Sequence, residues 1–175
     1  MRTTLVLTVR GHDRPGLIEQ LSTVVAAHAG SFSETRLIAL GGRVAGLHLV
    51  SVPSGQAAAL ANALRALAST LPEFQVDVDS GVAPAAAGQR LRLELVGLDR
   101  PGIVREVTRL LARHGVSIDE FETRCVSGSF AGGELFEVHA RLILPARLES
   151  ERLRELLAAL AQEMMVDITL EDGTP

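Results

Sequence analysis

The sequence lacks lysine, tryptophan and tyrosine, and it has one cysteine and one asparagine. Without lysine, neither Schiff-base catalysis nor a lysine-bearing phosphate loop can be built. A single cysteine, Cys125, excludes an internal disulfide and a multi-cysteine metal site, and it is compatible with a reducing compartment. Aromatic residues make up only 3% of the chain, so few side chains are available for stacking against nucleic acid bases.

The charge balance also argues against direct binding of nucleic acid. All 17 basic residues are arginines, there are 21 acidic residues, and the net charge is −4. Proteins that hold nucleic acid through their own surface are usually basic. No apolar run approaches the roughly 18 residues of a membrane helix, and the N-terminus is typical of a strand rather than a signal peptide. We therefore expect a cytoplasmic protein that contacts neither nucleic acid nor membrane.

The chain contains an internal repeat. Residues 12–18, His-Asp-Arg-Pro-Gly-Leu-Ile, recur at 98–104 as Leu-Asp-Arg-Pro-Gly-Ile-Val, and His28 recurs as His114. A Glu-Thr-Arg tripeptide also recurs, but two residues late, which predicts an insertion just before it. A repeat of this length indicates a duplicated domain rather than a solenoid unit. We predict one domain at 1–81, a small-residue linker at 82–89 and a second domain at 90–175.

Hydrophobic periodicity predicts the same order of elements in both copies. Alternating leucines open each copy and predict a half-buried strand, and apolar spacings of three and four then predict a helix that starts at the repeated motif. The remaining elements are expected as strands at 32–40, 44–52 and 74–79 with a helix at 55–71, and as strands at 117–127, 134–144 and 165–170 with a helix at 147–163. Glycines at 41–42 and within 128–133 mark the hairpins. This βαββαβ order predicts two ferredoxin-like α+β domains, each an antiparallel sheet with two helices on one face.

A βαββαβ unit with Asp-Arg-Pro-Gly-aliphatic at its first strand–helix junction resembles the ACT domain, a small ligand-sensing module that often binds amino acids. Two such units covering nearly the whole chain resemble the family of the glycine cleavage system transcriptional repressor. The resemblance implies a regulatory protein that senses a small amino acid and acts through a protein partner. It also implies pairing of such units, and we expect a homodimer.

The repeated motif is the candidate ligand site. Backbone N–H groups at a helix N-terminus favour an anion such as a carboxylate, and a motif aspartate can receive an ammonium group. The resemblance adds the start of the second strand of each unit, where a serine stands in both copies. The candidate ligand-binding residues are Asp13, Arg14, Gly16, Leu17 and Ser31 in the first copy, and Asp99, Arg100, Gly102, Ile103 and Ser117 in the second.

A purely structural role for the motif remains an equal alternative. The aspartate can cap the helix, proline suits its first position, and glycine suits the turn. No histidine pair has zinc-ligand spacing, so we expect neither metal nor cofactor. Cys125 lies on an expected strand and is interpreted as a buried small hydrophobic residue rather than a nucleophile.

Three functions remain open from the sequence. The first is an amino-acid-sensing regulator that acts through a transcription regulator or a metabolic enzyme. The second is a regulatory subunit bound permanently to a biosynthetic enzyme. The third is an acylphosphatase-like hydrolase on the same fold, which would need an arginine and an asparagine beside a glycine-rich phosphate loop, whereas Asn62 lies in the middle of an expected helix.

Overall fold

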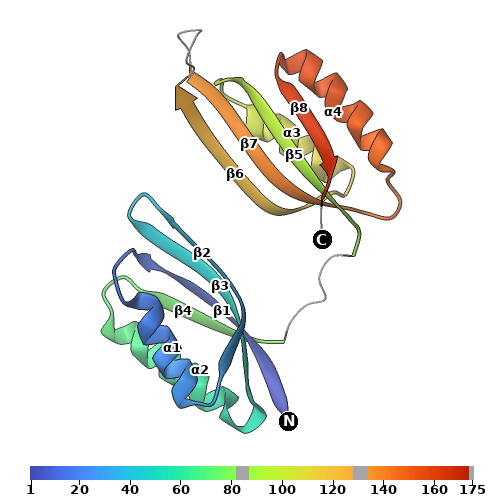
Figure 1. Ribbon diagram of the computed structural model, residues 1–175. Coiled ribbons are helices and arrows are strands. Elements are labelled where there is room, and N and C mark those ends of the chain that lie inside the picture. Colours follow the sequence, from blue (N-terminus) through green and yellow to red (C-terminus); the bar gives the residue numbers. More distant parts are fainter. Residues whose placement is uncertain (82–86, 128–133, 174–175) are drawn as a thin grey trace. The chain divides into compact units, whose positions relative to one another are not determined.

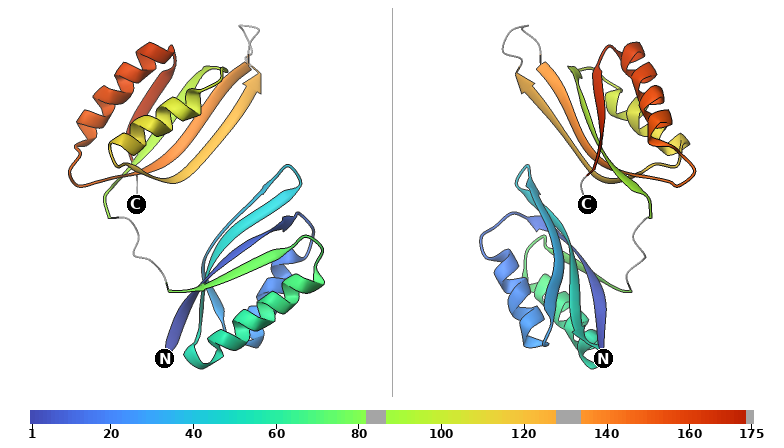
Figure 2. Two further views of the ribbon diagram at one scale, coloured as in Figure 1. Left: turned by 180° about the vertical axis from the view of Figure 1, so that it is seen from behind. Right: turned by 45° about the vertical axis from the view of Figure 1, so that its right-hand side comes forward.

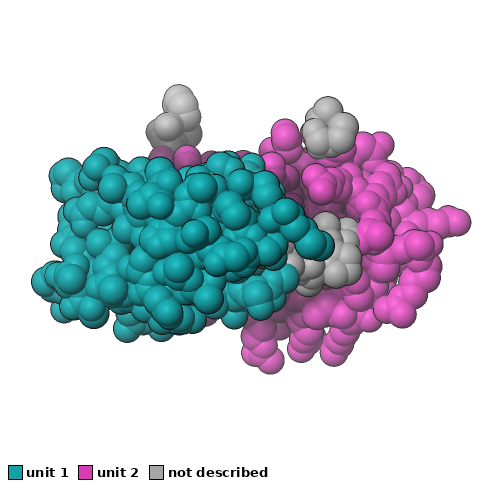
Figure 3. All heavy atoms as spheres, turned by 90° about the horizontal axis from the view of Figure 1, so that it is seen from below, with its two compact units in different colours: residues 1–84 teal, residues 85–175 magenta. Residues whose placement is uncertain are grey.

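The computed structural model describes residues 1–81, 87–127 and 134–173. The chain forms two compact units, residues 1–84 and 85–175, which are coloured separately in Figure 3. Most of the expected linker, residues 82–86, lies outside the described residues. In the described part of the chain, no helix is both long and apolar enough to cross a membrane.

The first unit has the expected βαββαβ order (Figure 1). Its sheet is antiparallel, with strand order β2-β3-β1-β4, so β2 and β4 are the edges. A short 3-10 turn at Ser54–Gln56 precedes the second helix. The elements are β1 (Arg2–His12), α1 (Leu17–Ala27), β2 (Ser31–Leu40), β3 (Arg43–Pro53), α2 (Ala57–Thr70) and β4 (Gln75–Ser80).

The second unit repeats this architecture, with strand order β6-β7-β5-β8. In both units the two helices cover one face of the sheet and leave the other face without helices (Figure 2). Two ferredoxin-like units are therefore confirmed. The elements are β5 (Gln89–Leu98), α3 (Ile103–Arg113), β6 (Ser117–Ser127), β7 (Glu134–Leu144), α4 (Ser150–Met164) and β8 (Asp167–Asp172).

Each unit has its own hydrophobic core between its sheet and its helices. The alternating leucines of β1 and β5 point into these cores, as a period of two predicts. The helices contribute residues at spacings of three and four, so that one stripe of each faces the sheet. The fully buried leucines that anchor the two cores are Leu7, Leu21, Leu60 and Leu64 in the first unit, and Leu91, Leu93, Leu95, Leu111, Leu142, Leu153 and Leu157 in the second.

The first helix of each unit does not begin as expected. It starts at Leu17 or Ile103, and its N-cap is Gly16 or Gly102 rather than the motif aspartate. Both glycines have positive φ (85° and 100°) with ψ close to zero, near the roughly +80° and 0° of the third residue of a type II turn, which requires glycine and commonly follows proline. The motif proline therefore precedes the helix, and neither aspartate is a cap.

The length difference between the two copies lies in a hairpin and not before the Glu-Thr-Arg tripeptide. Ser31 and Thr4 both pair with Ser51 on β3, and Ser117 and Arg90 both pair with Ile143 on β7. Ser117 and Arg90 follow Ser31 and Thr4 by the same number of residues that separates the two copies of the motif. The start of the second strand is therefore not displaced. The additional residues fall in the connection between β6 and β7, whose expected glycines lie in 128–133, outside the described residues.

One buried polar side chain distinguishes the first core. His48 on β3 is 1% exposed. Its Nδ1 lies 3.1 Å from Thr35 Oγ1, and its ring packs edge-on against Phe32. Its Nε2 is buried without a hydrogen-bond partner in the described part of the chain. Burial lowers the pKa of His48 below the usual 6.5, because the charged imidazolium loses its hydration.

The lowered pKa of His48 predicts that the first unit loses stability in acid. Above a pH of about 6.5 the imidazole is neutral in the folded and unfolded chains, but below it the unfolded chain binds a proton that the folded chain does not. We expect the melting temperature to fall as the pH is lowered from 7.5 to 5.5, and to fall less in His48→Gln. Thermal unfolding followed by circular dichroism measures both. Identical pH dependence in the two proteins would contradict the assignment.

Candidate functional site

The repeated motif of the second unit lines an open pocket at the junction of β5 and α3. The pocket has a volume of about 450 Å³. It combines an acidic group, two basic groups and an apolar surface, which are the chemical features that an amino acid zwitterion needs. Its lining residues are Asp99, Arg100, Gly102, Ile103, Val104, Arg105 and Phe136.

Backbone N–H groups are available at this pocket. The first bond within α3 is donated by the Glu106 N–H to the Gly102 carbonyl oxygen at 3.0 Å. The N–H groups of residues 103–105 therefore have no acceptor within the helix. They lie at the positive end of the helix dipole, beside the Arg105 side chain. This side chain is 76% exposed, and its Nε lies 4.0 Å from Glu106 Oε1, so most of the guanidinium still faces solvent. A carboxylate placed here meets both a guanidinium and backbone donors.

The two charged residues of the motif itself differ in how they are held. The Asp99 N–H donates to the Glu134 carbonyl oxygen at 3.0 Å, which ties the loop to the start of β7. Its side chain is exposed and has no ion-pair partner among the described residues. Arg100 is anchored, since its Nη2 donates to the Met164 carbonyl oxygen at the end of α4 at 2.5 Å. Asp99 is therefore free to receive an ammonium group, whereas Arg100 positions the loop.

In the first unit the corresponding loop is bordered by an ion cluster. Arg43 donates through Nη1 to Glu73 Oε2 at 3.0 Å, and His12 contacts the same carboxylate oxygen. The hydrogen bond from Arg43 and the charge of His12 lower the pKa of Glu73, so this carboxylate stays ionised. His12 is thus engaged by Glu73. The Asp13 N–H donates to the Gly42 carbonyl oxygen at 3.0 Å, as in the second unit.

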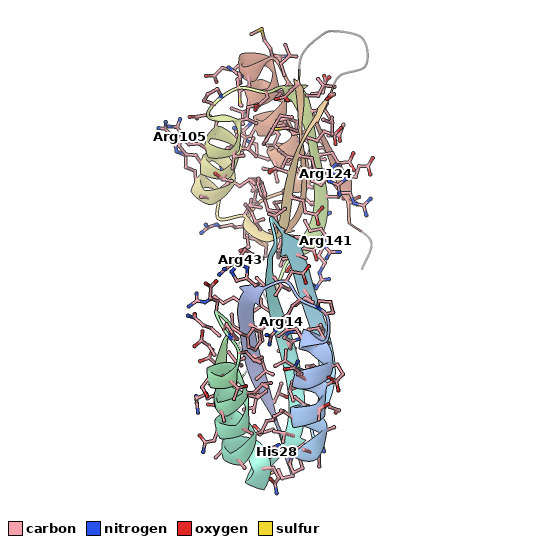
Figure 4. The ribbon with its side chains drawn as sticks, turned by 90° about the vertical axis from the view of Figure 1, so that its left-hand side faces the viewer. Arg14, His28, Arg43, Arg105, Arg124 and Arg141 are labelled. Carbon is pink, nitrogen blue, oxygen red and sulfur yellow. The ribbon has the colours of Figure 1, made fainter. Side chains whose placement is uncertain are left out.

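Arg14 completes the first loop. The Arg14 side chain is half-buried, and its Nη2 atom has no hydrogen-bond partner among the described residues. Figure 4 shows Arg14 and Arg43 toward the same end of the unit, opposite His28. The first loop therefore uses its charged neighbours for structure, whereas the second has Leu98 and Leu135 at the places of His12 and Arg43.

The two serines do not join the motif loops of their own units. Ser31 starts β2 at the level of Thr4, and the motif follows His12 at the far end of β1. Eight residues of strand correspond to a distance on the order of 25 Å at ~3.3 Å per residue. Ser117 is likewise aligned with Arg90, far from Leu98. Within each unit the loop and the serine therefore lie at opposite ends of the sheet, because α1 and α3 carry the chain from one end to the other. A role of Ser31 and Ser117 in ligand binding stays a prediction.

Sequence reasoning also missed part of the pocket. Phe136 on β7 lies opposite Gly97 and Cys125, so its ring reaches the motif from a distant strand. Cys125 is exposed rather than buried, because it stands on the edge strand β6. Partial desolvation and the carboxylates of Asp99 and Glu134 raise the pKa of its thiol, which disfavours the reactive thiolate. Phe136 and Cys125 come close to the motif loop through the pairing register of β5, β6 and β7, which local sequence patterns do not predict.

The comparisons with known proteins agree with this architecture. Among solved structures, an unknown protein from Galdieria sulphuraria superposes with a TM-score of 0.86 at 30% identity, and the match covers 99% of this chain and 100% of that one. A proposed glycine cleavage system transcriptional repressor superposes with a TM-score of 0.71 at 16% identity over 100% and 99% of the two chains. The second likeness shows a shared fold. No protein of curated function matches the chain.

Family models identify the two halves separately. A model described as ACT domain matches residues 3–79, and another with the same description matches residues 91–162. Each match lies within one structural unit and includes its motif loop. The chain belongs to the ACT-domain family and carries two ACT domains in tandem.

Proposed function

We propose that this protein is a regulatory sensor that binds a small amino acid at the motif loop of its second ACT domain. The observation that carries the proposal is the pocket in which the Asp99 carboxylate, which has no ion-pair partner among the described residues, and the Arg105 guanidinium flank the first N–H groups of α3. The carboxylate of the ligand binds the N–H groups and Arg105, and its ammonium group binds Asp99. Phe136, Ile103 and Val104 offer an apolar surface to the side chain of the ligand.

A thermal-shift screen of the twenty amino acids tests the proposal. A ligand that binds only the folded protein raises its melting temperature, and the free energy of unfolding increases by about 2.7 kcal/mol when the ligand concentration is 100 times Kd. We expect a shift with one or a few amino acids, and isothermal titration calorimetry then measures the affinity. No shift with any of them at millimolar concentration would contradict the proposal.

The sensor acts through a protein partner in the cytoplasm. The overall charge of −4 argues against direct binding of nucleic acid, so a role in transcription would require an intermediary protein. The structural likeness to a proposed glycine cleavage system transcriptional repressor is compatible with this route. A regulatory subunit of a metabolic enzyme would use the same ligand site. Co-purification from the native host distinguishes these partners.

Catalysis is not part of the proposal. An acylphosphatase-like reaction needs an asparagine beside an anion-binding loop. Asn62 instead lies within α2, where its Oδ1 accepts a hydrogen bond from Arg65 Nη1 at 3.3 Å. This position favours a binding function over hydrolysis.

The proposed homodimer is supported by an apolar surface on the first unit. Ile38, Leu40 and Leu47 are 56%, 77% and 54% exposed on the helix-free face of the sheet. The equivalent places of Ile38 and Leu47 in the second unit are Arg124 and His139, and that of Leu40 is Val126. The second unit thus has polar side chains at two of these places on its helix-free sheet face. The apolar side chains at the same places in the first unit indicate that another protein surface covers them.

A further inference from the structure

The helical side of the second unit carries a groove that the ligand site does not use. The groove lies between α3 and α4, which run side by side over one face of the sheet (Figure 2). It has a volume of about 280 Å³. The apolar side chains on its floor and walls are Leu110, Leu156, Ala159 and Leu160, and the charged or titratable side chains around it are Glu106, Arg109, Arg113, His114 and Glu163.

Basic side chains gather at the end of the groove where α3 ends. Arg109 and Arg113 are one turn apart on α3, both are exposed, and His114 follows as the C-cap. Arg147 belongs to the same end, because a Cβ added to Gly115 would lie 2.5 Å from its Nη2. Glu106 pairs with Arg109 at 3.1 Å, which leaves Arg113 and Arg147 without an ion-pair partner among the described residues.

The first unit provides an internal comparison. Counting from the equivalent C-cap residues His28 and His114, α1 has Thr23 and Ala27 where α3 has Arg109 and Arg113. On the other wall, the buried leucines of α2 and α4 align, and Ala63 stands where α4 has Leu156. Small uncharged residues therefore suffice for the fold at these places. The second unit also has Glu106 and Glu163 where the first has Gln20 and Thr70, but both lie toward the start of α3, and Glu106 is paired with Arg109. The arginines near the end of α3 and the larger leucine therefore need a reason other than the fold.

We propose that the groove between α3 and α4 binds an acidic amphipathic helix of the protein partner. Carboxylates at i and i+4 of such a helix have the spacing of Arg109 and Arg113, roughly 6 Å along the axis. Its apolar face covers Leu110, Leu156 and Leu160. This apolar floor favours a helix over a nucleic acid, because the phosphates of a nucleic acid would contact the arginines and leave the apolar side chains uncovered. The inference rests on the proposed function, since it names the surface through which the sensor reaches its partner.

A designed peptide of about 18 residues, long enough to form a helix when bound, serves as the probe. It carries leucines at spacings of three and four, with glutamates flanking them. Two control peptides replace every glutamate with lysine or every leucine with serine. Fluorescence anisotropy gives Kd, and methyl NMR locates the binding surface. We expect only the acidic, leucine-bearing peptide to bind, to shift the methyl signals of Leu110, Leu156 and Leu160, and to bind more weakly as salt is raised.

The matched variant carries Arg109→Thr and Arg113→Ala, which install the residues of the first unit. Two exposed charge pairs of up to ~1 kcal/mol each correspond to a loss of affinity of about 3- to 30-fold. Arg65→Thr on α2 is the control and should leave Kd unchanged. Absence of peptide binding, equal binding of the lysine peptide, an unchanged Kd in the double variant, or displacement of the peptide by a DNA duplex would each overturn the proposal.

The amino acid screen separates the two hypotheses. The single variant Arg113→Ala should keep the thermal shift of the wild-type protein, because it leaves Asp99, Arg105 and the ion pairs of Glu106 intact. If the peptide binds but no amino acid raises the melting temperature, the proposed amino acid site is wrong and the groove proposal stands. If an amino acid raises the melting temperature but the peptide does not bind, the groove proposal is wrong and the amino acid site stands.

Discussion

Replacing Asp99 with asparagine is expected to weaken binding of the amino acid ligand about 10- to 100-fold. The change removes the negative charge that faces the ligand ammonium group and keeps the size of the side chain. A hydrogen bond to a charged group contributes ~1.5–3 kcal/mol, and 1.4 kcal/mol corresponds to a factor of ten in Kd. Isothermal titration calorimetry with the amino acid of largest thermal shift measures the change.

The structure makes this substitution a clean test of charge recognition. Gly102, not Asp99, is the N-cap of α3, and the backbone N–H of Asp99 makes its hydrogen bond to Glu134 whatever side chain it carries. Asp13→Asn is the matched control, because the first loop is bordered by the His12, Arg43 and Glu73 cluster. Unchanged affinity in the Asp99 variant, with an unchanged melting temperature in the absence of ligand, would assign the ligand to another place.

Introducing charge on the apolar face of the first unit is expected to convert the dimer into a monomer. In the double variant Ile38→Glu and Leu47→Glu, two exposed apolar side chains become carboxylates. Removing the apolar contacts of two such side chains costs ~3 kcal/mol or more, before the cost of burying charge, so the dimer dissociates about 100-fold more readily. Analytical ultracentrifugation should show a species of about twice 18.6 kDa for the wild-type protein and a monomer for the variant.

The second unit supplies the control for this experiment. His139→Glu changes the residue equivalent to Leu47, on a face that already carries charged pairs such as Arg141 with Glu120. It should leave the sedimentation of the wild-type protein unchanged. A wild-type monomer at all concentrations, or an apolar-face variant that remains dimeric, would refute the assembly without affecting the fold.

Local patterns predicted the architecture well because they report local physics. Alternating leucines in β1 and β5 can bury one face only as strands, and the glycine in each motif has the positive φ that its turn requires. The repeat then showed that the pattern occurs twice. The order βαββαβ, the hairpins and the place of the motif at the first strand–helix junction all follow from residues close to one another in the chain.

The sequence by itself determined two ferredoxin-like ACT domains and the place of the repeated motif at the first strand–helix junction of each. Only the tertiary structure decided which residues share a site. Strand register brought Phe136 and Cys125 to the second motif loop and placed Ser31 and Ser117 at the opposite end of each sheet. Local patterns describe the face and period of each element, but pairing between strands distant in the chain depends on how whole elements pack. That packing also bordered the first loop with the ion cluster of His12, Arg43 and Glu73, whereas Asp99 in the second loop has no ion-pair partner in the part of the chain that the structure describes.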